Sequence, residues 1–231
     1  MKQGFTLIEV LVSVVILAII MMLIQSTTWQ MLGAKEQMEA RDMVFQQARV
    51  ALRKITDDIT GAFLTSKIPS TQQITLGGTA SKEAKMTTFF IGEERGEQDQ
   101  LRLTTLSHMR LFQNAKESDQ ARIAYTIVPS EARDQTFQLM RMEIPWLEEG
   151  REVPGKGFPL AEGLLQFQLE YYDDRKEEWV REWDTEKIDW KDRLPSAVRI
   201  SLLFPDPDAE GETLHFTTAV FLPLSRGALA F

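Results

Sequence analysis

The sequence predicts an α+β protein, in which a long N-terminal helix with a membrane-spanning first half packs on an antiparallel β-sheet domain. Three observations predict this fold. The chain opens with an almost uncharged apolar run, and the segment after it spaces apolar residues helically without a proline. The remainder alternates polar and apolar residues in short runs separated by turns. A helix followed by successive strands is an arrangement typical of α+β domains.

The apolar run extends from Phe5 to Ile24 and contains one charged residue, Glu9. A helix of this length covers roughly 30 Å, which matches the hydrocarbon core of a bilayer. A secretory signal would have a shorter core of roughly 7–15 residues and a small-residue cleavage site after it. Gln25 and Ser26 follow the run here, without such a site. We therefore expect a transmembrane helix over residues 5–24.

Composition limits the remaining possibilities. With 231 residues, of which 43% are hydrophobic, the chain can supply a membrane helix and one globular domain. The formal net charge of −8 argues against nucleic-acid binding, which depends on neutralising phosphates. No cysteine is present, so disulfides and thiolate metal sites are excluded. Lys2 precedes the apolar run, and the positive-inside bias therefore predicts a domain in the periplasm, anchored in the inner membrane.

Helical character should continue beyond the membrane, to about Ala62. Apolar residues recur at spacings of three and four and form one stripe, which we expect to pack on the domain. The stripe consists of Val44, Ala48, Ala51, Leu52, Ile55, Ile59 and Phe63. Gly33 is a weak point that we expect to mark a bend, and Gly61 followed by Pro69 predicts the end of the helix. Residues 25–63 would be the periplasmic continuation of the helix, and residues 64–231 a β-rich domain.

Seven segments after the helix are predicted as strands. They cover residues 86–91, 101–106, 122–128, 137–144, 164–171, 198–202 and 214–222. The third and fourth segments, and the last two, are close enough in sequence to form hairpins. The sequence predicts no order for the strands within the sheet.

Glu9 is unusual because a carboxylate inside a membrane helix costs roughly 2.5–3.5 kcal/mol. In one interpretation, the carboxylate lies close enough to the lipid headgroups to stay hydrated. In the other, the chain is cut after Gly4, and the new amine of Phe5 pairs with Glu9 of a neighbouring subunit. In a low-dielectric environment this charge pair would favour one register between adjacent helices.

The residues from Gly4 to Val10, Gly-Phe-Thr-Leu-Ile-Glu-Val, resemble the processing signal of type IV pilins and type II secretion pseudopilins. The resemblance implies that a prepilin peptidase removes residues 1–4 by cutting after Gly4. It also implies that the same enzyme N-methylates Phe5, and that Glu9 assists assembly. A pilin-like fold is implied as well.

Further segments resemble the J-type minor pseudopilin of type II secretion, general secretion pathway protein J. These segments are residues 124–127, 139–141, 171–174 and 194–200, together with Trp179 and Trp183. The resemblance implies a structural subunit without turnover, cofactor or metal. It also implies a pseudopilus tip complex with I-, K- and H-type minor pseudopilins, which starts assembly on an inner-membrane platform and supports protein export. The acidic segment 173–191 is longer and more charged than the resemblance leads us to expect.

Three alternatives remain open at this stage. A minor type IV pilin would share the N-terminal signal, and a membrane-anchored periplasmic binding module would share the anchor. A membrane-anchored enzyme would need a convergent catalytic cluster. His108 and His215 lie far apart in sequence, and neither belongs to a zinc or triad motif. The acids at 173, 174, 177 and 178 could form a glycosidase pair, but we interpret them as a solvated charged loop.

Two other sites have competing interpretations. Residues 206–211 match the first half of a calcium loop, but its twelfth position would be Thr217, which cannot supply a bidentate carboxylate. We therefore interpret this segment as an acidic hairpin turn. Trp179, Trp183 and Trp190 form either a partner-binding surface or part of the core, and the sequence does not discriminate between these.

Overall fold

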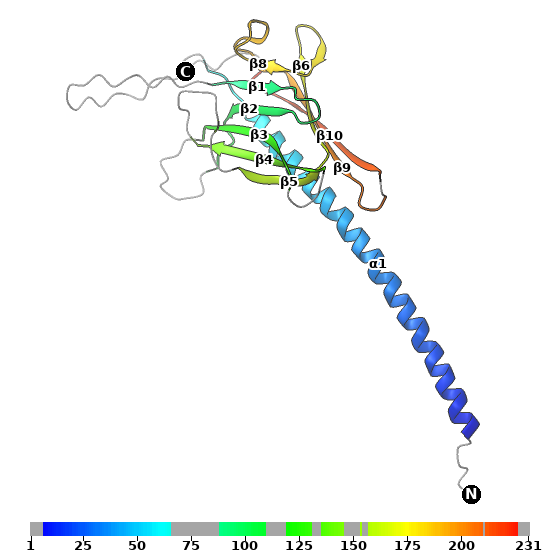
Figure 1. Ribbon diagram of the computed structural model, residues 1–231. Helices are drawn as coiled ribbons and strands as arrows, with labels where there is room; N and C mark the ends of the chain where they lie inside the picture. The colour runs from blue at the N-terminus through cyan, green and yellow to red at the C-terminus, as the bar shows by residue number, and fades with distance from the viewer. Residues whose placement is uncertain are drawn as a thin grey trace, which may run out of the picture.

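A computed structural model describes residues 7–65, 88–109, 119–130, 135–145, 153, 157–209 and 211–225. The helix α1 (Leu7–Thr60) has 54 residues and passes position 33 without a break. Its first half projects away from a β-rich domain, and its second half enters that domain (Figure 1). The prediction of one long helix is therefore confirmed over the described residues, and the helix ends one residue before Gly61.

The described part of the chain forms ten strands and one short 3-10 helix. They are β1 (Phe90–Glu93), β2 (Gln100–Thr105), β3 (Ala121–Pro129), β4 (Phe137–Ile144), β5 (Phe158–Leu164), β6 (Gln166–Asp173), β7 (Glu178–Val180), β8 (Trp183–Asp184), η1 (Ile188–Trp190), β9 (Ala197–Pro205) and β10 (Thr213–Phe221). All pairings between these strands are antiparallel. The two predicted hairpins, β3–β4 and β9–β10, are present.

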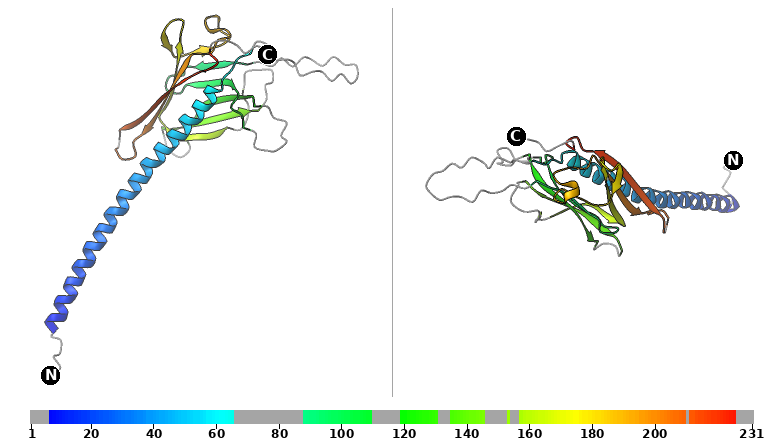
Figure 2. Two further views of the ribbon diagram at one scale, coloured as in Figure 1. Left: turned by 180° about the vertical axis from the view of Figure 1, so that it is seen from behind. Right: turned by 90° about the horizontal axis from the view of Figure 1, so that it is seen from above.

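The strands form two sheets rather than the single sheet that we expected. One sheet has the order β5-β4-β3-β2-β1-β8, and the other has the order β10-β9-β6-β7. The second half of α1 lies between them and contacts β5, β2, β9 and β10 (Figure 2). The segment between β1 and β2 also contacts the other sheet, because Gln98 forms an isolated β-bridge with Phe167 of β6.

The apolar stripe of α1 forms the centre of the core. Ala48, Ala51, Ile55 and Ile59 are fully buried, and they share one hydrophobic cluster with residues from both sheets. At the end of the helix, the main-chain oxygen of Gly61 accepts a hydrogen bond of 2.9 Å from the amide of Leu106. A side chain at Gly61 would meet the Thr105 hydroxyl at 2.7 Å, so glycine permits this close approach.

Three strands were absent from the prediction. β5 contains Pro159, Glu162 and Gly163, which interrupt an alternating pattern, and it lies at a sheet edge, where proline is tolerated. β7 and β8 are too short to show an alternation of polar and apolar residues. Leu164, which we placed in the strand ending at Tyr171, belongs to β5. The predicted start of β1 at residue 86 and the predicted Pro69 boundary lie outside the described residues.

Candidate assembly site

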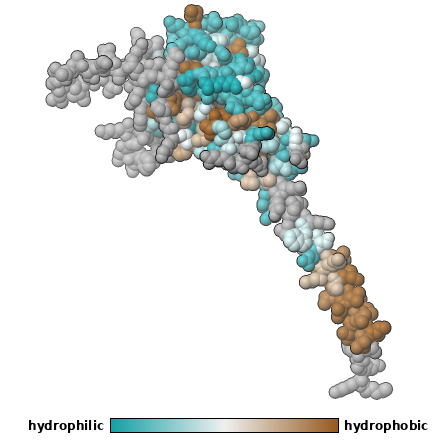
Figure 3. Space-filling view, in the orientation of Figure 1, coloured by the Kyte–Doolittle hydropathy of each residue, from teal (hydrophilic) through white to brown (hydrophobic). Residues whose placement is uncertain are grey.

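On the face that Figure 3 shows, the surface of the lower part of α1 is mostly apolar. Its segment Leu7–Trp29 is long and apolar enough, by length and composition, to cross a membrane. Gly4 and Phe5 lie outside the described residues, so the cleavage site stays a prediction. Glu9 lies in the first turn of α1 with an exposed side chain. Its carboxylate contacts no polar group among the described residues.

A buried polar cluster attaches α1 to the six-stranded sheet. The carboxylate of Asp58 is fully buried and accepts hydrogen bonds from Arg141 Nε at 2.6 Å and Tyr125 Oη at 2.5 Å. Its other oxygen accepts one from Ser107 Oγ at 2.5 Å and lies 3.1 Å from Lys54 Nζ. Because each of these partners except Lys54 belongs to the β domain, the cluster fixes the helix against β2, β3 and β4.

The electrostatics of the cluster keep the guanidinium of Arg141 charged. Burial opposes the charge on Arg141, but the hydrogen bond and charge of Asp58 raise the guanidinium pKa above its ordinary value. Burial, together with the Asp58 charge, raises the pKa of Tyr125 well above its ordinary value, so its hydroxyl stays a donor. Burial opposes ionisation of Glu143, yet hydrogen bonds from His108 and Arg141 lower the pKa of this carboxyl.

Sequence analysis missed Asp58. A signal was present, because Asp58 follows Ile55 by three positions and precedes Ala62 by four, which places an acid within the apolar stripe. The cluster has a structural role rather than a catalytic one. Ser107 donates to an acid instead of to a histidine, and His108 contacts Glu143 at 2.5 Å. His215 lies on a different sheet, on β10.

The acidic segment 173–191 begins at the last residue of β6. We expected a solvated loop there, but this first residue is not solvated. Asp173 is buried, and its oxygens lie 2.7 and 3.0 Å from the two terminal nitrogens of Arg193. Trp190 Nε1 donates to the same carboxylate at 3.2 Å. Burial opposes ionisation, but the hydrogen bonds from Arg193 and from the Arg175 amide lower the pKa of Asp173. A carboxyl engaged in this way is a structural anion.

The tryptophans of this segment have different environments. Trp183 is fully buried in the main core and stacks on Trp190, with ring centroids 5.4 Å apart. Trp179 packs against Tyr172 and under the guanidinium of Arg199, whose carbon lies 4.1 Å from the ring centroid. The core interpretation is therefore correct for Trp183.

The loop between β9 and β10 contains the calcium-like acids. Asp206 accepts a hydrogen bond from the Asp208 amide at 2.9 Å, which is typical of an acidic turn. Arg41 of α1 lies 4.0 Å from Asp206 and 3.1 Å from Asp208. Residue 210 is outside the described part of the chain, and within that part no group of three or more histidines, cysteines or acids is arranged to hold a metal ion.

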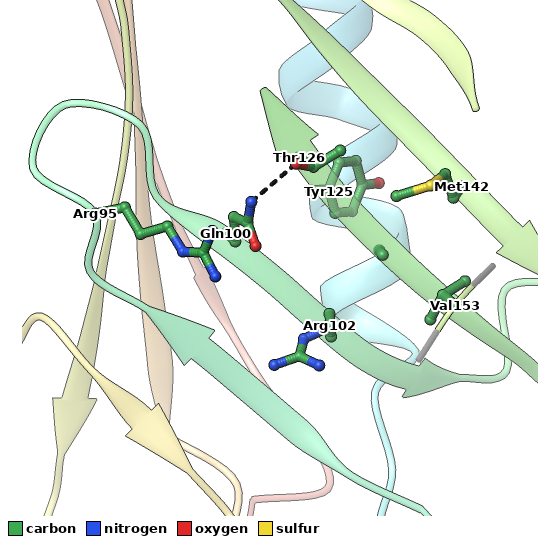
Figure 4. Close-up of a pocket in the computed structure, with 8 residues that line it drawn as sticks. Arg95, Gln100, Arg102, Tyr125, Thr126, Met142 and Val153 are labelled. Carbon is green, nitrogen blue, oxygen red and sulfur yellow. Dashed lines mark hydrogen bonds between the residues drawn. The ribbon is translucent and has the colours of Figure 1, made fainter. Parts of the chain in front are cut away.

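A hollow of about 290 Å³ lies on the face of the six-stranded sheet that points away from α1 (Figure 4). Gln100 and Thr126 form a hydrogen bond of 3.0 Å at its side. Two arginines line it, Arg95 and Arg102, and both form ion pairs with Glu93. Glu93 therefore neutralises part of the positive charge at the hollow.

Two protein-family models match this chain. The family model described as "Type II secretion system (T2SS), protein J" matches residues 26–208, and the model of the prokaryotic N-terminal methylation motif matches residues 1–24. No curated protein matches the chain. One chain of the crystal structure of the GspK-GspI-GspJ complex from the enterotoxigenic Escherichia coli type 2 secretion system is 16% identical, with a TM-score of 0.46. The similarity covers 80% of this chain and 99% of that one.

The match to the secretion family includes the second half of α1, the whole six-stranded sheet and three of the four strands of the other sheet, and it ends inside the β9–β10 turn before β10. It follows the methylation motif with one residue between them. Because the family model matches residues 26–208, which is well over half of the chain, the chain belongs to the family of type II secretion system protein J.

Proposed function

We propose that this protein is a minor pseudopilin, part of the pseudopilus tip complex that initiates assembly and supports export of folded proteins across the outer membrane. The observation that carries the proposal is the adjacency of the two family matches on one chain, residues 1–24 and 26–208. A single helix connects these two parts without interruption. The membrane signal and the secretion domain are therefore one mechanical unit.

We infer the following domain organisation. Residues 1–4 are the leader, residues 5–24 the transmembrane helix, and residues 25–60 its periplasmic continuation, because α1 ends at Thr60 rather than near residue 63. Residues 61–231 form the periplasmic domain. The inner membrane holds the anchor. A 54-residue helix is about 81 Å long. Because Asp58 and Arg141 tie the helix to the sheet, a displacement of the anchor moves the whole domain.

Assembly depends on two opposite charges near the N-terminus of the processed helix. Cleavage after Gly4 gives Phe5 a positive amine, and Glu9 of a neighbouring subunit supplies the opposite charge. The exposed position of Glu9 on α1 leaves its carboxylate accessible to a neighbour. The neighbouring subunits are the I-, K- and H-type minor pseudopilins. The prepilin peptidase acts before assembly, and the inner-membrane assembly platform acts during it.

Processing provides the first test. Co-expression with a prepilin peptidase should give a protein that starts at methylated Phe5, as measured by intact mass and N-terminal peptide mass. Glu9→Leu should be processed in the same way but should reduce pseudopilus formation and secretion, because its carboxylate no longer pairs with the neighbour's amine. Glu9→Asp is the matched control, since it keeps the charge. An uncleaved wild type, or secretion at full level with Glu9→Leu, would contradict the proposal.

Gene deletion provides the second test, since it separates this function from that of a minor type IV pilin. Loss of exoprotein secretion with surface pili intact is expected. Loss of pili with secretion intact would instead indicate a type IV pilin.

A further inference from the structure

Strand β10 is an edge strand with an uncharged sequence. It has nine residues, Thr-Leu-His-Phe-Thr-Thr-Ala-Val-Phe, without proline, glycine, lysine or acid. It pairs with β9 along its whole length in continuous register, and no other described strand pairs with it. An edge of this kind can accept an additional strand from another chain.

The backbone groups that point away from β9 can be identified from two hydrogen bonds at the ends of the hairpin. The amide of Asp206 donates to the oxygen of Glu212, and the amide of Leu222 donates to the oxygen of Ser196. Antiparallel pairs alternate between bonded and non-bonded positions. The even-numbered residues of β10 therefore bond to β9. The odd-numbered residues, which are Thr213, His215, Thr217, Ala219 and Phe221, direct their amides and carbonyls outward.

The other three sheet edges have features that oppose strand addition. β7 has three residues and β8 has two. β5 contains Pro159 and has two register shifts against β4. Short strands, proline and bulges are the means by which proteins protect edges. Among the four edges of the described sheets, β10 has none of these protections.

A hollow of about 450 Å³ lies beside this edge, between β10 and α1. Phe45 and Leu52 form its apolar part together with Phe216, which packs edge-to-face on Phe45 with centroids 5.1 Å apart. Arg49 and Arg53 form its charged part. Both arginines are exposed, and neither forms an ion pair within the described part of the chain.

The spacing of the two arginines fits an added strand. They lie one helical turn apart, a separation of about 6 Å along α1. Alternate residues of a strand, which share one face, are about 6.8 Å apart. Two carboxylates at positions i and i+2 of an added strand could therefore reach one arginine each, while the apolar residues beside them cover Phe45 and Leu52.

We propose that β10 binds an extended segment of a partner protein, which adds as a fifth strand and places alternating acidic side chains against Arg49 and Arg53. A second copy of this chain is a poor occupant, because its own β10 would bring no acid to the arginines. The inference goes beyond the proposed function and does not depend on it, since strand addition can be measured on a chain that is not assembled.

The test uses the full chain in detergent and a fluorescent synthetic peptide as long as β10, with glutamate at alternate positions and valine and threonine between them. Thr217→Pro removes an outward amide while leaving the β9 pairing intact. It should weaken peptide binding, measured by fluorescence anisotropy, by about tenfold or more. Thr217→Val is the matched control and should bind like the wild type. Arg49→Glu with Arg53→Glu should reverse the preference, so that a lysine version of the peptide binds more tightly.

Hydrogen exchange on the wild type supplies a readout that needs no variant. The outward amides of β10 should exchange more slowly when the glutamate peptide is saturating, and those of the β7 edge should not change. Equal binding of Thr217→Pro and Thr217→Val, or equal binding of the glutamate and lysine peptides to the wild type, would overturn the proposal. So would a wild-type dimer in sedimentation that Thr217→Pro dissociates, because the occupant would then be a second copy.

Discussion

Asp58 of α1 and Arg141 of β4 are 83 positions apart in sequence, yet Oδ2 of the acid lies 2.6 Å from Nε of the arginine. Both residues are buried, and a second hydrogen bond of 3.3 Å joins Oδ1 to Nη2. Tyr125 and Ser107 complete the hydrogen bonds of the carboxylate. A helix that slid or rotated by one residue would separate these atoms, so the pair defines the register of α1 against the sheet.

We expect Arg141→Met to lower the free energy of unfolding by about 3–5 kcal/mol, because it leaves the Asp58 carboxylate buried without its main counter-ion. Urea unfolding followed by tryptophan fluorescence measures this change. Trp183 is a suitable reporter, since it is buried in the core that α1 completes.

Two further variants give the control. Lys54→Met removes the partner whose side chain is 36% exposed, and it should cost less than about 1 kcal/mol. Asp58→Leu combined with Arg141→Met removes both charges and should recover most of the loss, because no unpaired charge remains. A stability of Arg141→Met close to that of the wild type would show that the pair does not hold the helix.

Local patterns were sufficient to predict much of this fold. The stripe from Val44 to Phe63 predicted which face of α1 is buried, because helical spacing fixes relative side-chain directions regardless of what covers them. Alternation predicted β4 with the boundaries that the structure has, 137–144. The methylation motif is a contiguous signal, and it is identifiable from seven residues.

The rest depends on contacts between distant segments. Asp58 acquires its role from Arg141 and Tyr125, and Asp173 from Arg193, and no spacing rule connects these residues. The division into two sheets follows from β6 pairing with β9 rather than with β5, and the alternating pattern of β6 does not specify which strand it pairs with. Charge density alone suggested that residue 173 is solvated, whereas the half-buried Arg193 makes the same carboxylate part of the interior.

Gly92 lies so close to a neighbouring side chain that no larger residue fits without a shift. A Cβ atom there would lie 1.9 Å from the hydroxyl of Tyr171, which is itself fully buried. We expect Gly92→Ala to cost about 1–3 kcal/mol through overpacking, as measured by urea unfolding. Tyr171→Phe should be neutral or slightly stabilising, because its buried hydroxyl has no hydrogen-bond partner among the described residues. The double variant should recover part of the loss, and a fully tolerated Gly92→Ala would contradict this interpretation.

Asp173 should make stability depend on acid pH. Its folded pKa lies below the ordinary value of 3.8, so its contribution is present above pH 3.8 and is lost as the pH falls through the folded pKa. At pH 7 we expect Asp173→Asn to be less stable than the wild type by about 3 kcal/mol, because Arg193 loses its buried charged partner and keeps only the exposed Asp174. The difference in free energy of unfolding between the two proteins should narrow below pH 3.8. A difference that stays constant down to pH 2.5 would contradict the lowered pKa, and Asp174→Asn, at an exposed position, serves as the control.

The acidic turn after β9 should show no response to calcium, because Arg41 already faces the carboxylates of Asp206 and Asp208. A bound ion at a hundred times its dissociation constant would add about 2.7 kcal/mol, which raises the melting temperature of a protein of this size by roughly 5–10 °C. We expect the same melting temperature in calcium and in a chelator. Arg41→Gln tests whether Arg41 keeps calcium away from these carboxylates. The variant should still fold, since removing an exposed cation lowers the free energy of unfolding by less than about 1 kcal/mol. If calcium raises the melting temperature of this variant but not that of the wild type, Arg41 is the group that excludes the ion. A wild type that melts several degrees higher in calcium would instead show that the turn is a metal site.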